Sequence, residues 1–214
     1  EVDKFFLNFM STSLEKYKKY NQVFHISGFN FIHNSNMSSA FLSRYMNCWG
    51  WATWRDRWEQ LTMDADYFHR TFSNKIKWEF NCNGSHDFFR QITENRVGIL
   101  NTWAIFWYAS IFEKRGLCLY PPHSLVKNNG RDNSGERNGK KLKKITFLNT
   151  EVKNYPYKIQ ESSHDYLKLV QYFKSMDNHI TRMIKYIVYL LPYKFQKPIM
   201  NKLIYIRCIM INMR

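Results

Sequence analysis

The residues with the clearest chemical potential are four tryptophans within ten positions, in a 214-residue chain that has only seven. An indole offers a large apolar face and one hydrogen-bond donor, so Trp49, Trp51 and Trp54 could stack on the apolar face of a sugar ring. Gly50 would let the backbone approach such a ligand closely. The alternative is an aromatic core beneath a loop, and residue types alone leave the two interpretations equally open.

Two further residues of this segment have more ordinary interpretations. Arg55 could bind a substrate anion through its planar, permanently charged guanidinium group, or it could pair with Asp56 or Glu59, and we favour the pair. Trp58 follows Trp51 by seven residues, which places both on one face of a helix, and we expect Trp58 in the core.

The second candidate for chemistry is the dipeptide His86-Asp87. Ser85 is expected to cap a helix that runs to about Arg96, so that both residues lie in its first turn. The positive end of the helix dipole stabilises a carboxylate there and disfavours a protonated imidazole. A carboxylate that is ionised at working pH and stands among aromatic side chains suits a general base. The alternatives are an ordinary acidic residue at a helix start for Asp87 and a partly exposed polar residue for His86.

Helices and strands alternate around these residues. Helical spacing of apolar residues predicts helices over residues 3–19, 64–80, 85–96 and 101–115, and short apolar runs predict strands over residues 23–27 and 117–120. Polar stretches over 34–39 and 128–135 are expected to be loops. This order predicts an α/β fold.

The net charge of +15 is concentrated in the last third of the chain. Residues 1–135 hold 16 Lys and Arg against 12 Asp and Glu, whereas residues 136–214 hold 16 against 5. From residue 179 onward a helical apolar stripe with interleaved cations is interrupted by Pro192 and Pro198. This pattern is typical of a helix lying on an anionic membrane surface and is too interrupted to span one. A helix pair packed on protein is an equal alternative.

The four cysteines, at positions 48, 82, 118 and 208, form no C-x-x-C pair. Together with the lack of a signal peptide, they favour reduced thiols in a cytoplasmic protein.

The tryptophan segment reads W-G-W-A-T-W-R-D-R-W over residues 49–58. It resembles the W-G-W-[AG]-T-W-x-x-R-W signature in the C-terminal half of a bacterial family of GT-A-type glycosyltransferases, related to the family 2 group. Residues 1–135 are similar to this half throughout, with further matching motifs in the expected order: residues 5–10 with Leu14 and Tyr17, 26–29, 102–104, 119–121, 124–126 with Asn128 and Gly130, and 132–135.

The resemblance implies an incomplete GT-A, Rossmann-like half with a mixed sheet over residues 1–135. It does not cover residues 136–214, which their charge and apolar stripe predict to be a basic, helix-rich extension. It implies transfer of a sugar from a nucleotide-sugar donor to a saccharide or lipid-linked saccharide in surface-polysaccharide synthesis, at the inner face of the membrane. A divalent metal, Mg or Mn, would be held by an acidic motif upstream of Glu1, so we expect residues 1–214 alone to be inactive.

The resemblance also implies roles for individual residues. Asp87 would be the base that deprotonates the acceptor, and His86 replaces the first acid of the family's D-D pair and would position or assist it. The tryptophan segment would form a wall of the sugar site. His123 and Arg131 would lie near a loop that closes over the diphosphate.

Two functions from other classes compete with this one. A basic, aromatic-rich chain could bind nucleic acid, but the excess charge lies away from the tryptophans, whereas single-strand binders combine both in one groove, so we do not expect it. A carbohydrate-binding module without catalysis is the other alternative.

Overall fold

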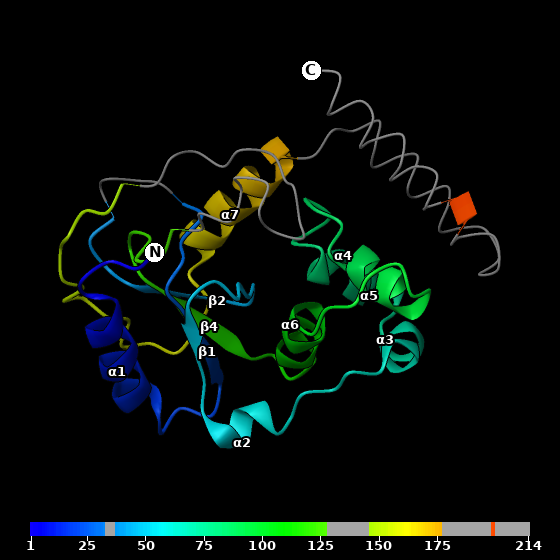
Figure 1. Cartoon of the computed structure of the whole chain (residues 1–214), viewed down its shortest axis with the longest axis horizontal. Coiled ribbons are helices and arrows are strands. Elements are labelled where there is room, and N and C mark those ends of the chain that lie inside the picture. Colours follow the sequence, from blue (N-terminus) through cyan, green and yellow to red (C-terminus); the bar gives the residue numbers. More distant parts are fainter. Residues whose placement is uncertain (33–36, 128–145, 177–197, 200–214) are drawn as a thin grey trace. The chain divides into compact units, whose positions relative to one another are not determined.

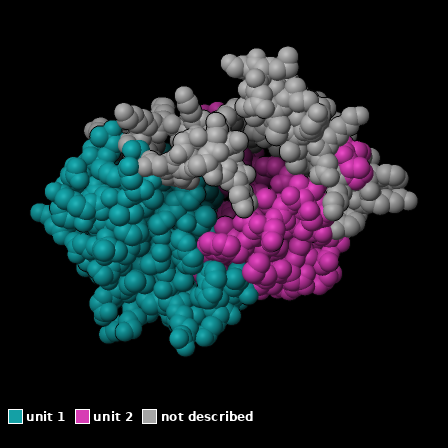
Figure 2. Space-filling view, viewed as in Figure 1, with its two compact units in different colours: residues 1–61, 110–172 teal, residues 62–109, 173–214 magenta. Residues whose placement is uncertain are grey.

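The computed structural model describes residues 1–32, 37–127, 146–176 and 198–199 (Figure 1). Within these residues the chain forms a mixed α/β fold with seven helices and a four-stranded mixed sheet that has one parallel pair, so the predicted α/β class is confirmed at this level. The chain divides into two compact units (Figure 2): unit 1 holds residues 1–61 and 110–172, and unit 2 holds residues 62–109 and 173–214.

The sheet belongs to unit 1 and has the strand order β2-β4-β1-β3. The two inner strands, β1 (Val23–Ser27) and β4 (Leu117–Tyr120), are parallel, and the outer strands β2 (Phe41–Ser43) and β3 (Trp51–Ala52) are antiparallel to their neighbours. Every residue of β1 and β4 is buried. A strand covered on both faces has a continuous apolar sequence, which is why both strands were predicted correctly from their apolar runs.

Helix α1 (Phe6–Tyr17) packs against β1 and β3 and confirms the first predicted helix. It begins three residues later than predicted, because Asp3 is buried outside the helix and forms hydrogen bonds with backbone groups. One Asp3 carboxylate oxygen accepts the Phe5 N–H at 2.9 Å and the other accepts the Asn149 N–H at 3.2 Å, while the Asp3 N–H donates to the carbonyl of Leu125 at 2.8 Å. Asp3 therefore fixes the start of α1 to two distant parts of unit 1.

The described residues 146–162 also pack on unit 1. Val152 lies in its core, the Tyr17 hydroxyl donates to the carbonyl of Pro156 at 3.0 Å, and the Glu161 carboxylate pairs with Arg44 at 2.9 Å. Helix α7 (Ser163–Met176), which the sequence patterns did not indicate, follows. The predicted domain boundary at residue 135 falls outside the described residues, as does most of the basic stripe from residue 179.

Unit 2 contains helices α3 (Ala65–Thr71), α4 (Asn74–Phe80), α5 (Phe89–Arg96) and the first six residues of α6 (Ala104–Glu113). Its buried side chains are largely aromatic: the rings of Phe80 and Tyr108 stack with centroids 4.3 Å apart, and the Tyr108 hydroxyl donates to the carbonyl of Phe80 at 2.8 Å. The predicted helix over 101–115 is confirmed as α6 within narrower bounds.

The prediction of one helix over residues 64–80 is wrong, because two caps divide it. Phe72 is extended, and the Ser73 hydroxyl accepts the Ile76 N–H at 3.3 Å, which begins α4 as a new helix. The sequence analysis also missed β2, β3 and the four-residue helix α2 (Arg55–Trp58), which are too short to show a periodicity.

Candidate functional site

Trp54 is held by the fold of unit 1. Its indole N–H donates to the carbonyl of Leu14 near the end of α1, at 3.3 Å. The guanidinium carbon of Arg57 lies 5.0 Å from the centre of its ring, and the ring packs against the core. The single donor of Trp54 and part of its apolar surface therefore already contact residues of α1 and α2.

Gly50 allows a close approach between segments of unit 1, whereas the sequence predicted a close approach to a ligand. Its φ is +57°, and a Cβ placed there would lie 2.4 Å from a methyl carbon of Val126 and 3.0 Å from the Phe6 ring. Its carbonyl accepts the Gly28 N–H at 2.6 Å. Only glycine fits this crossing of two backbone segments.

The Trp51 ring lies between two other rings, in a row of three that runs from the core toward the surface. Its ring lies nearly parallel to that of His25, with centroids 5.2 Å apart, and 5.5 Å from that of Trp58. His25 is fully buried and its Nε2 lies 2.8 Å from the carbonyl of Asn47. Because a carbonyl only accepts, Nε2 carries the proton and donates, and burial lowers the pKa of His25 to about 4.

The prediction that Trp58 lies in the core is wrong, since 36% of its surface is exposed. Trp51 belongs to strand β3 rather than to a helix, so the seven-residue spacing does not place Trp58 beside it on a buried helical face. The ring of Trp49 packs edge-on against Phe29, with centroids 4.6 Å apart. Trp51 and Trp58 thus belong to one aromatic cluster with His25, while Trp49 packs on a second aromatic group.

The expected ion pair of Arg55 is made by Arg57 instead. Arg57 is buried, pairs with Asp56, and donates to the carbonyl of Lys18 at 3.0 Å and to the amide oxygen of Asn21 at 2.9 Å. Arg55 is exposed and has no ion pair within the described residues.

His86 and Asp87 lie in unit 2, in a turn between α4 and α5. The prediction that they belong to the first turn of a helix capped by Ser85 is wrong, because α5 begins at Phe89 and Ser85 is buried. Three consecutive residues of this turn have left-handed backbone conformations, Cys82 at φ 49°, Asn83 at φ 54° and Gly84 at φ 69°. Such a run is rare for residues other than glycine, so the surrounding structure must hold it in place.

The Asp87 carboxylate is anchored through one oxygen. Its Oδ1 accepts the Arg90 N–H at 3.3 Å and the side-chain amide of Asn81 at 3.4 Å, and the amide oxygen of Asn81 accepts the Phe89 N–H at 2.8 Å. The other oxygen, Oδ2, has no hydrogen-bond partner in the part of the chain that the structure describes. Asn81 thus positions Asp87, a role the sequence analysis missed, although an Asn directly after a helical segment is the available signal.

The other residues of the expected site are His86, His123 and Arg131. His86 is half-buried, with its ring centroid 4.6 Å from that of Phe88 and 5.8 Å from that of Phe173. His123 Nε2 lies 3.1 Å from the carbonyl of Thr150. Arg131 falls outside the described residues. The tryptophan segment belongs to unit 1 and Asp87 to unit 2, so their joint action in one site remains a prediction.

His69 is another titratable residue of unit 2. Its Nε2 lies 3.2 Å from the Thr93 hydroxyl, and its ring packs edge-on against Phe89. Burial, with smaller effects of Lys77 and Arg96, lowers the pKa of His69 to about 4, so the imidazole is neutral near pH 7.

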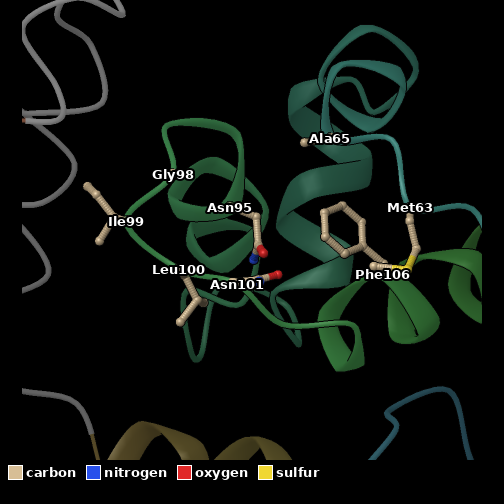
Figure 3. A pocket seen from close by; sticks show the side chains of 8 residues that line it. All are labelled: Met63, Ala65, Asn95, Gly98, Ile99, Leu100, Asn101 and Phe106. Carbon is tan, nitrogen blue, oxygen red and sulfur yellow. The ribbon is translucent and has the colours of Figure 1, made fainter.

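A pocket of about 420 Å³ also lies in unit 2 (Figure 3), lined by Met63, Ala65, Asn95, Gly98, Ile99, Leu100, Asn101 and Phe106. The Asn95 amide is already used, since it donates to the carbonyl of Gln91 at 2.7 Å and accepts the Thr102 N–H at 2.9 Å. No lining residue titrates near neutral pH. The pocket could hold a small ligand, but it offers no acid or base.

The described residues do not fit a divalent metal. Among them, no group of three or more His, Cys, Asp or Glu side chains could hold one, and both oxygens of Asp3 are bonded to backbone N–H groups. Cys48, Cys82 and Cys118 form no disulfide bond within the described residues.

No helix within the described ranges is long and apolar enough to cross a membrane. Comparisons of the chain with protein-family models, with curated proteins and with solved structures found no match.

Proposed function

We propose that this chain is the acceptor-binding and catalytic part of a glycosyltransferase that moves a sugar from a nucleotide-sugar donor to a saccharide or lipid-linked saccharide. The observation that carries the proposal is the Asp87 carboxylate. Asn81 and the Arg90 N–H fix its Oδ1, while its Oδ2 has no partner among the described groups. A carboxylate held in this way is oriented and still able to accept a proton.

The chemistry follows from that geometry. The acceptor hydroxyl attacks the anomeric carbon of the donor, the bond between that carbon and the diphosphate oxygen breaks, and Asp87 Oδ2 takes the hydroxyl proton. The diphosphate leaves with the electron pair of the broken bond. A general base in such a position contributes about 10²- to 10⁴-fold to the rate.

The aromatic segment supports the same proposal from unit 1. The partly exposed Trp58 offers indole surface of the kind that stacks on sugar rings, whereas Trp51, Trp54 and Gly50 hold the segment in place. The mixed α/β fold is compatible with one half of a GT-A domain, the architecture we propose.

The proposal places a divalent metal, Mg or Mn, outside the described residues, with its ligands upstream of Glu1. No step above depends on it. We further propose that the protein works on surface-polysaccharide precursors at the cytoplasmic face of the membrane, where the basic stripe from residue 179 would contact anionic lipids.

The decisive experiment compares two aspartates with similar structural roles. Asp64 accepts the Tyr67 N–H at 2.9 Å at the start of α3, much as Asp87 accepts the Arg90 N–H. Both are replaced by asparagine in the full-length protein. Release of nucleoside diphosphate is measured with a panel of nucleotide sugars and oligosaccharide acceptors.

We expect Asp87→Asn to lower the turnover by at least 10²-fold and Asp64→Asn to leave it unchanged. Equal turnover of the two variants would overturn the role of Asp87. Saccharide binding by the wild-type protein without turnover on any donor would favour the carbohydrate-binding module instead. Tight oligonucleotide binding that weakens steeply with salt would favour the nucleic-acid-binding alternative.

A further inference from the structure

Trp78 is a large exposed aromatic residue that the proposed reaction does not use. It lies in α4, two residues before the end of the helix, and 54% of its surface is exposed. Nearly all other aromatic side chains of α3, α4 and α5 pack into unit 2. The Trp78 indole is also more exposed than Trp58 and Trp103, each of which exposes 36% of its surface.

The turn that carries Asp87 holds the indole by one edge. A Cβ on Gly84 would lie 2.8 Å from Nε1 and 3.1 Å from Cδ1 of Trp78, so the five-membered ring lies directly against the glycine backbone. The Gly84 N–H also donates to the carbonyl of Trp78 at 3.0 Å. Contact through this edge orients the ring while much of its surface stays exposed.

The turn itself is fixed from both sides. The Ser85 N–H donates to the carbonyl of Cys82 at 3.1 Å, the His86 N–H donates to the carbonyl of Asn81 at 3.2 Å, and both Cys82 and Ser85 are buried. These contacts hold the left-handed residues 82–84, whose conformation costs about 1 kcal/mol or more at each position that is not glycine. The exposed indole therefore packs against a turn whose conformation is already fixed by these hydrogen bonds.

Asn81 connects this indole to the candidate base. It follows Trp78 by three residues at the end of α4, a spacing that places both on the same side of a helix. Its side-chain amide donates to Asp87 Oδ1 at 3.4 Å. An apolar ring and an oriented carboxylate thus belong to one short, hydrogen-bonded unit, whose backbone connects α4 to α5 (Figure 1).

We propose that Trp78, the turn over residues 82–84 and Asp87 form a saccharide subsite, in which a pyranose ring stacks on the indole and one of its hydroxyls donates to Asp87 Oδ2. A pyranose has the required chemistry, because its C–H face is apolar and its rim carries hydroxyls. The inference rests on the proposed function in one respect, since it identifies this sugar with the acceptor. Trp78 then aligns the hydroxyl that Asp87 deprotonates.

The subsite is tested by binding, without turnover. The chain is labelled with 5-fluorotryptophan, the ¹⁹F resonance of Trp78 is assigned with the Trp78→Phe variant, and methyl glycosides of glucose, galactose, mannose and N-acetylglucosamine are titrated. We expect at least one glycoside to shift this resonance with saturation. Trp78→Ala should weaken its binding about tenfold, measured by saturation-transfer NMR, and Trp78→Tyr should weaken it less, because a flat ring remains.

Tyr157, which is 97% exposed, provides the matched control, and Tyr157→Ala should leave binding unchanged. A Trp78 resonance that no glycoside moves, in a chain whose circular dichroism is native, would overturn the subsite. So would equal binding by Trp78→Ala and wild type.

The two proposals fail in different ways. If Asp87→Asn abolishes transfer while Trp78→Ala leaves the KM for the acceptor unchanged, the subsite is wrong and the reaction stands. If glycosides bind at Trp78 while Asp87→Asn transfers sugar at the wild-type rate, the reaction is wrong and the subsite stands.

Discussion

The tryptophan segment over residues 49–58 and the segment over residues 78–87 contain similar chemical groups but use them differently. In the first, the indole N–H of Trp54 donates to the carbonyl of Leu14, and Gly50 lies where two backbone segments of unit 1 cross. In the second, the Trp78 indole is mostly exposed and one Asp87 oxygen has no partner among the described groups. A density of unusual residues therefore does not by itself mark a site. What matters is which donors, acceptors and ring faces the fold leaves unused.

Substitution of the two glycines tests this difference most strongly. Gly50→Ala adds a methyl group 2.4 Å from a Val126 carbon at a positive φ, so we expect a loss of about 2 to 5 kcal/mol in unfolding free energy from backbone strain and overpacking. In Gly84→Ala the added methyl group meets one edge of the exposed Trp78 indole and no buried side chain, and we expect a loss of about 1 to 2 kcal/mol. Urea unfolding measures both, and equal losses would contradict the comparison.

The buried histidine beneath Trp51 makes stability depend on pH. The folded-state pKa of His25 is about 4, below its ordinary value of 6.5, so the unfolded chain binds more protons between these values. This contribution to the free energy of unfolding is complete above about pH 6.5 and decreases by about 3 kcal/mol as the pH falls to 4. We expect His25→Phe, which keeps a ring against Trp51, to reduce this slope in urea unfolding at several pH values. His69, with a similar pKa, should contribute a comparable slope from unit 2. A wild-type slope in the His25→Phe variant would show that His25 does not titrate in this way.

Two conservative tryptophan substitutions should differ by a smaller amount. Trp54→Phe removes the donor to the Leu14 carbonyl and part of the ring beneath Arg57, and we expect a loss of about 1 to 2 kcal/mol. Trp58→Phe removes a donor from a partly exposed ring and should cost less. Thermal unfolding of the two variants checks the order, and the reverse order would contradict the structural role of Trp54.

The smallest effect is expected at Trp78. Because its indole is mostly exposed and rests on Gly84 by one edge, Trp78→Phe should change the unfolding free energy by less than about 0.5 kcal/mol. A loss above 1 kcal/mol would mean that the indole mainly stabilises unit 2. Chemical denaturation beside the Trp54→Phe variant gives the comparison directly.

Several helices and strands could be predicted because their residues follow local patterns of apolar spacing. The apolar runs of β1 and β4 and the helical spacing of α1 and α6 reflect burial along one element, which a sequence carries by itself. The break between α3 and α4 could not be predicted from periodicity, since the apolar spacing continues across it while Phe72 turns extended and Ser73 starts a new cap. The strands β2 and β3 form only because inner strands elsewhere in the chain offer them an edge.

The sequence by itself determined the α/β class and the inner strands, because each depends on residue type and on neighbours close along the chain. Only the tertiary structure decided that Arg57 rather than Arg55 holds Asp56, that Trp58 is partly exposed, and that Asn81 orients Asp87. These outcomes depend on which groups meet across a turn, a sheet or a helix pair. A hydrogen bond formed inside the fold removes a group from use by a ligand, and residue type does not reveal that.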